Sequence, residues 1–146
     1  MTTITPLPRR STPVETSHTL PPIPASVREA RLIVARELAV NGFAAHSDDA
    51  ELLASELVTN AVSYAGGEIV LVLSFRDDTV HCEVRDSSPV APVQRRSPDD
   101  DEHGRGLFLV QTLARSWGTR VQGTGKAVWF ELGPASWCEQ PGSLAA

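Results

Sequence analysis

Apolar residues recur at three- and four-residue spacing across residues 47–65, and this periodicity predicts an amphipathic helix. Ser47 or Asp48 would cap its N-terminus, and Gly66-Gly67 would end it. The positions on its expected buried face are Ala50, Leu53, Ala54, Leu57, Val58, Ala61 and Val62.

Two further helices are expected, one on each side of this element in the chain. Ser26 and Glu29 have the spacing of a capping box, so we expect a helix that begins there and ends at Asn41-Gly42. The pattern from Gly104 to Ser116 predicts a third helix. The apolar positions are Val27, Ala30, Val34 and Leu38 in the first, and Leu107, Val110, Leu113 and Ala114 in the other.

Alternation of apolar and polar residues predicts two β-hairpins. In the first, Val80, Cys82 and Val84 would point inward, and the residues between them outward. Residues 15–20 could add a short edge strand before a cluster of prolines. The paired strands and their turns would be residues 69–75 and 79–86 around 76–78, and residues 117–122 and 127–132 around 123–125.

The order of these elements separates helices from hairpins, which favours an α+β fold. We expect a two-layer sandwich, in which a mixed, mostly antiparallel sheet carries the helices on one face. Residues 1–15 would form a flexible leader, residues 16–133 a single domain and residues 134–146 a flexible tail. The segment 87–103, with three prolines and the acidic run 99–102, would be a long loop, which in a compact domain is functional or disordered.

The composition is that of a globular protein, because 41% of the 146 residues are hydrophobic and 21% are charged. A net charge of −5 argues against a nucleic-acid partner, which would require a basic surface. Cys82 and Cys138 have the spacing of neither a metal site nor a disulfide framework. No apolar run is as long as a membrane span, and no signal-peptide core is present, so a cytoplasmic location is expected. Lys126 is the only lysine.

Glu56 and Asn60 are one helical turn apart, on the flank of the apolar stripe of helix 47–65. A carboxylate and a carboxamide side by side at the edge of a core could hold hydrated Mg²⁺ and orient a hydroxyl nucleophile. The alternative is an ordinary polar rim, since such pairs are common on helices.

Three further motifs contain candidate binding groups. Asp86, at a strand end, could accept a hydrogen bond from an exocyclic amine, or it could simply begin a turn. Gly104-Arg105-Gly106 opens a helix whose free N–H groups could bind an anion, although a flexible helix entry explains the glycines equally well. The sequence Gly123-Thr124-Gly125-Lys126 is explained by a hairpin turn alone.

Taken in order, these motifs resemble those of the GHKL (histidine kinase-like) ATP-binding superfamily over roughly residues 24–132. The similarity is greatest to its stand-alone anti-sigma factor serine kinases. Residues 56–61 (E-L-V-T-N-A) match the N-box of that subfamily, residues 102–107 (E-H-G-R-G-L) its second glycine box, and residues 125–132 its last strand. The resemblance implies the Bergerat ATP-binding fold.

The resemblance also implies roles for individual residues, with ATP and Mg²⁺ as cofactors. Asn60 would coordinate Mg²⁺, Glu56 would be the general base toward a serine hydroxyl, and Asp86 would bind the adenine amino group. Residues 87–103 would form the ATP lid. The remaining nucleotide-binding positions would be Ser88, Gly104, Arg105, Gly106, Leu107 and, behind the adenine pocket, Thr124.

Two features depart from the superfamily pattern. Many members have D-x-G-x-G after the strand, whereas this chain has Asp86-Ser87-Ser88-Pro89-Val90, which makes the adenine rim stiffer. The four acids of residues 99–102 would repel a triphosphate unless they point outward or bind Mg²⁺.

The function implied by the resemblance is that of a serine kinase that phosphorylates an anti-anti-sigma (STAS-type) protein and sequesters a sigma factor, as a homodimer that binds neither nucleic acid nor membrane. The alternative is a nucleotide-gated protein-binding regulator without kinase turnover, which would need Asn60 but not Glu56. A detached histidine-kinase catalytic domain and a purely structural protein are the other interpretations. The former fits less well, because no histidine lies in a phosphoacceptor context.

Overall fold

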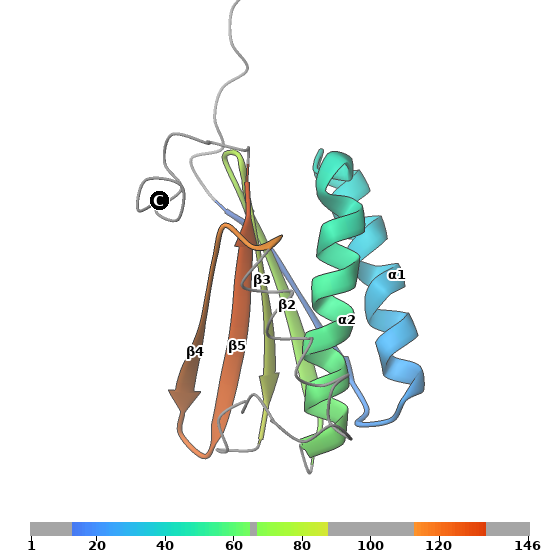
Figure 1. Cartoon of the computed structure of the whole chain (residues 1–146), viewed down its shortest axis with the longest axis vertical. Helices are drawn as coiled ribbons and strands as arrows, with labels where there is room; N and C mark the ends of the chain where they lie inside the picture. The colour runs from blue at the N-terminus through green and yellow to red at the C-terminus, as the bar shows by residue number, and fades with distance from the viewer. Residues whose placement is uncertain (1–12, 65–66, 88–112, 134–146) are drawn as a thin grey trace, which may run out of the picture.

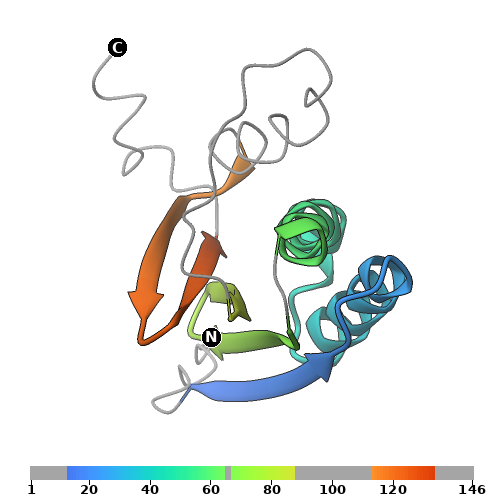
Figure 2. The ribbon, with the colours of Figure 1, turned by 90° about the horizontal axis from the view of Figure 1, so that it is seen from below.

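In the part of the chain that the structure describes, five antiparallel strands form one sheet in the order β1-β2-β3-β5-β4, and two helices lie side by side against one of its faces (Figures 1 and 2). The computed structural model describes residues 13–64, 67–87 and 113–133. The antiparallel sheet with helices on one face confirms the expected α+β sandwich. The elements are β1 Val14–Leu20, α1 Ala25–Val40, a 3₁₀ turn Ala44–His46, α2 Ser47–Tyr64, β2 Ile69–Arg76, β3 Thr79–Asp86, β4 Ser116–Gln122 and β5 Gly125–Leu132.

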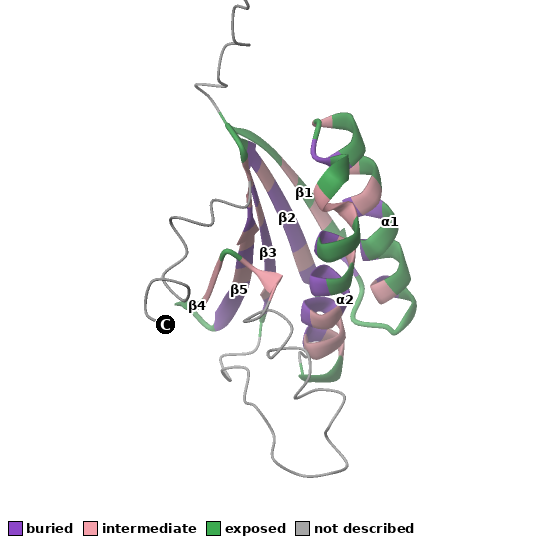
Figure 3. Ribbon diagram, turned by 45° about the horizontal axis from the view of Figure 1, so that its top comes forward, coloured by how far each residue is buried: buried purple, intermediate pink, exposed green. Residues whose placement is uncertain are grey.

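The core lies between the helices and the sheet, where Figure 3 shows the buried faces of both layers. Its largest fully buried side chains include Phe75 of β2, Phe130 of β5 and Leu53 of α2. The apolar stripe predicted for α2 is buried as expected, apart from Val62, which is half-buried and packs against the core. Val80, Cys82 and Val84 of β3 point to this same layer. Because the strand period is two, the next residue of β3 on the helix side is Asp86.

The predicted capping box at the start of α1 is wrong. The helix begins at Ala25, after Pro24, whose φ of −55° already lies in the helical range. Ser26 consequently lies inside the first turn, where it is buried and donates a hydrogen bond from its hydroxyl to the Pro21 carbonyl at 2.6 Å. The predicted end of this helix at Asn41-Gly42 is confirmed, and Gly42 takes the left-handed φ of +84°.

The third helix was predicted to reach Ser116, and that boundary is wrong. Residues 104–112 lie outside the described part of the chain, Leu113 is helical, and β4 begins at Ser116. The register of the closing hairpin explains the difference, because Ser116 pairs with Glu131 and donates its hydroxyl to that carboxylate at 2.9 Å.

A buried carboxylate lies on the sheet face that carries no helix. Glu83 is only 3% exposed, although alternation predicts that it points outward. It accepts hydrogen bonds from Arg85 and from Arg120, the latter at 2.9 Å. Trp129 is the cross-strand partner of Glu83 on β5. Its ring lies so close to Gly118 that a Cβ on this glycine would be 2.7 Å from Cζ2 of Trp129. The outer face therefore buries Glu83 with its own side chains.

Burial raises the pKa of Glu83, but the hydrogen bonds and charges of Arg85 and Arg120 outweigh it, so the pKa lies below its ordinary value of 4.5. The ionised carboxylate therefore contributes stability above that value, and the contribution is lost as the pH falls through the lowered pKa.

The substitution Glu83→Gln tests this contribution. The amide NH₂ of glutamine would face a guanidinium, so we expect the free energy of unfolding to fall by about 1–3 kcal/mol at pH 7. Urea unfolding of both proteins at pH 7 and pH 3 should show this difference shrink in acid. An equal difference at both pH values would contradict the assignment.

Candidate functional site

Glu56 and Asn60 lie on the flank of α2, half-buried, between its core face and its exposed face. The two polar residues beside them are bonded within the helix: Ser55 Oγ donates to the Glu51 carbonyl and Thr59 Oγ1 to the Ser55 carbonyl, each at 2.7 Å. Within the described residues the carboxamide of Asn60 makes no hydrogen bond. The Asn60 carboxamide could therefore bind a ligand without giving up a hydrogen bond to another described residue.

Asp86 is the last residue of β3 and lies at the end of the sheet where α2 also ends (Figure 1). The register of β3 against β5 places it directly opposite Lys126, on the helix side of the sheet. The Lys126 ammonium lies 3.1 Å from Oδ1 and 3.0 Å from Oδ2 of this carboxylate. The side chains are 2% exposed for Asp86 and 7% for Lys126. The site thus contains a buried ion pair, of which the sequence motifs indicated only the acid.

Two glycines allow the chain to approach the end of β3 closely. A Cβ on Gly125 would lie 2.2 Å from the Asp86 carbonyl oxygen, a distance at which the backbone would have to move. A Cβ on Gly67 would lie 3.0 Å from Ser87 Oγ. Gly125 was interpreted as part of a hairpin turn, but the turn itself consists of Gly123 and Thr124, with Gly123 at φ +58°. Gly125 is instead the first residue of β5, where the lack of a side chain lets it lie against the Asp86 carbonyl.

The other predicted site residues are not assembled within the described part of the chain. Thr124 is exposed in the β4–β5 turn, and Lys126, two residues later, is the β5 residue that contacts Asp86. The remaining predicted nucleotide-binding residues, Ser88, Gly104, Arg105, Gly106 and Leu107, and most of the predicted lid lie outside the described residues. Their roles stay predictions.

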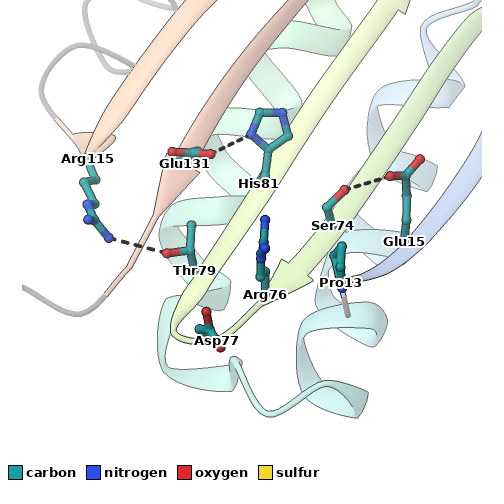
Figure 4. A pocket seen from close by; sticks show the side chains of 9 residues that line it. All are labelled: Pro13, Glu15, Ser74, Arg76, Asp77, Thr79, His81, Arg115 and Glu131. Carbon is teal, nitrogen blue, oxygen red and sulfur yellow. Dashed lines mark hydrogen bonds and ion pairs between the residues drawn. The ribbon is translucent and has the colours of Figure 1, made fainter. Parts of the chain in front are cut away.

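A separate hollow of about 370 Å³ lies on the helix-free face of the sheet, beside the β2–β3 turn (Figure 4). Its polar groups bond to one another: His81 Nδ1 lies 3.0 Å from Glu131 Oε2, and Arg115 donates to Thr79 Oγ1 at 3.4 Å. The β2–β3 turn is at the opposite end of the sheet from Asp86 (Figure 1). None of the predicted site residues lines this hollow.

The carboxamide oxygen of Asn60 would suit Mg²⁺ better than a transition metal. No group of three or more His, Cys, Asp or Glu side chains that could hold a metal occurs among residues 13–64, 67–87 and 113–133. Magnesium does not require such a cage, because it keeps several waters and takes one or two protein oxygens together with phosphate oxygens. The carboxamide oxygen of Asn60 could serve as a ligand of this kind.

Comparison with known proteins identifies one matching family. A family model described as a histidine kinase-like ATPase domain matches residues 20–132, which include every described helix and all of the sheet except most of β1. No curated protein matches the chain. In the described regions, none of the helices is long and apolar enough to cross a membrane.

Proposed function

The chain belongs to the histidine kinase-like ATPase family, and on this premise we propose that it is a Mg²⁺·ATP-dependent protein serine kinase that also acts as an anti-sigma factor. The family indicates ATP binding. The more specific activity is supported by the pair Glu56 and Asn60 on the flank of α2, which would supply a base and a metal ligand one helical turn apart.

ATP would bind across the end of the sheet where β3 and α2 both finish. The buried carboxylate of Asp86 would accept a hydrogen bond from the adenine amino group, and Asn60 would hold the metal at the phosphates. Bound Mg²⁺ would neutralise phosphate charge, which is its ordinary contribution to phosphoryl transfer. Glu56, one turn before Asn60, would be adjacent to the γ-phosphate.

In the transfer step, Glu56 would accept the proton of a substrate serine hydroxyl as its oxygen bonds to the γ-phosphorus. The bond from that phosphorus to the β–γ bridging oxygen breaks, and ADP leaves. Positioning supplies most of the rate in such reactions, so the fixed one-turn spacing of Glu56 and Asn60 on a rigid helix matters.

The proposed serine substrate is a STAS-type anti-anti-sigma protein, and the proposed sequestered partner is a sigma factor. Nucleotide state and phosphorylation would decide which of the two is bound, as expected of a two-state switch. We further propose that the active form is a homodimer.

A second candidate function is a nucleotide-gated binding regulator without turnover. The observation in its favour is that Asn60 and the buried Asp86 carboxylate would together suffice to bind Mg²⁺·ATP. Glu56 favours the kinase, because a regulator that only binds nucleotide has no need of a base.

Calorimetric titration with ATP, in the presence and absence of Mg²⁺, tests the nucleotide site. We expect micromolar binding that requires Mg²⁺. Incubation with γ-labelled ATP and the STAS-type proteins of the source organism then separates the two functions: label on serine supports the kinase, and binding without transfer supports the regulator. No binding at millimolar ATP would overturn both.

A further inference from the structure

Lys126 is the only lysine of the chain, and it is buried beside the carboxylate expected to recognise adenine. Its ammonium contacts both oxygens of Asp86, at 3.0 and 3.1 Å. The two residues are register partners on neighbouring strands, so this contact is built into the sheet. A nucleobase that bonds to either oxygen of Asp86 must therefore lie next to the Lys126 ammonium.

The charges of the pair explain why a lysine can be buried here. An isolated carboxylate that is 2% exposed would be strongly disfavoured, and the ammonium compensates it. Adenine is neutral and cannot take over this compensation. Lys126 must therefore keep a contact with Asp86 when the base is bound, and it remains in the base pocket rather than leaving it.

We propose that Lys126 is a second base-recognition residue, which donates a hydrogen bond to a purine ring nitrogen beside the amino group. This inference rests on the proposed ATP site. When the adenine amino group bonds to one oxygen of Asp86, the ammonium can keep the other oxygen and turn one N–H toward the base. The ring nitrogens N1 and N7 both flank the amino group, and both are acceptors. Asp86 and Lys126 together thus present an acceptor and a donor to one edge of the base.

Calorimetry with ATP, 1-deaza-ATP and 7-deaza-ATP at saturating Mg²⁺ tests this contact. Each analogue replaces one ring nitrogen by C–H and keeps the amino group. We expect the wild-type protein to bind one of the two about tenfold or more weakly than ATP, as for loss of a hydrogen bond to a charged donor. In Lys126→Met that difference should disappear. Equal binding of all three nucleotides by the wild type would overturn the inference while leaving the ATP site intact.

Arg120→Met is the matched control for Lys126→Met. It also removes one cation from a buried carboxylate, Glu83, but on the opposite face of the sheet. Titrations would be made well below the unfolding temperature of both variants. The control should retain the wild-type difference between ATP and the analogue. If it loses that difference as well, the effect of Lys126→Met comes from lost stability, and the inference fails.

A measurement on the unmutated protein covers the case in which Lys126→Met does not fold. Protein labelled with ¹⁵N-lysine has a single side-chain ammonium signal, because the chain has one lysine. ATP should shift this signal, and the deaza analogue that binds weakly should shift it differently at saturation. An identical shift with all three nucleotides would exclude the proposed contact. No ATP binding at all would overturn the proposed function, and this inference with it.

Discussion

Asn60→Ala is expected to abolish Mg²⁺-dependent ATP binding, with no detectable heat at ATP concentrations that saturate the wild type. The carboxamide is the proposed metal ligand, and losing it removes the contact through which Mg²⁺ would link the phosphates to α2. Stability should change little, because Asn60 is half-buried and its side chain makes no hydrogen bond within the described residues. Alanine is also the best helix former. Calorimetry and thermal unfolding of the same samples would measure both effects.

Thr59→Ala is the matched control for this prediction. It changes the neighbouring residue of the same helix turn, whose hydroxyl bonds to the Ser55 carbonyl and to no other described residue, and it should bind ATP as the wild type does. A variant Asn60→Ala that binds Mg²⁺·ATP normally would remove Asn60 from the metal site. Equal loss of binding in both variants would indicate damage to α2 rather than loss of a ligand.

The elements that sequence periodicity predicts well are those whose apolar residues lie on one side. Every buried position of α2 except Ser55 has an apolar residue, and the apolar residues Val80, Cys82 and Val84 of β3 all lie on the helix side. Each of these elements has only one orientation that buries its apolar side. The start of α1 was missed because two local signals compete there. A serine with a glutamate three residues later indicates a cap, yet Pro24 provides a helical φ two residues before that serine.

The candidate site could be predicted residue by residue but not pair by pair. Asp86 is visible as an acid at a strand end, and Lys126 as an isolated lysine after a turn. Their contact depends on the register of β3 with β5, which joins residues 40 positions apart and follows from no local pattern. The burial of Glu83 was not predicted for a related reason, since Arg120 bonds to it from β4, the outer strand of the closing hairpin.

Glu56→Gln and Glu56→Ala are expected to slow phosphoryl transfer by about a hundredfold or more, while ATP binds nearly as tightly as to the wild type. The carboxylate would act only on the proton of the serine hydroxyl, so its removal affects the transition state and not the bound nucleotide. Glutamine keeps the size and polarity of the side chain and removes only its basicity. The two variants should therefore be impaired to a similar degree.

Single-turnover transfer of the γ-phosphoryl group, beside calorimetry with Mg²⁺·ATP, separates these effects. The decisive comparison is with Asn60→Ala, one helical turn away, which should lose binding and transfer together. A Glu56 variant that loses ATP binding as completely as Asn60→Ala would instead place the carboxylate among the groups that hold the nucleotide. Unchanged transfer in Glu56→Gln would mean that the serine loses its proton without a base. If the Glu56 variants bind ATP normally but transfer phosphate slowly, then Asn60 binds the metal and Glu56, one helical turn away, takes the proton.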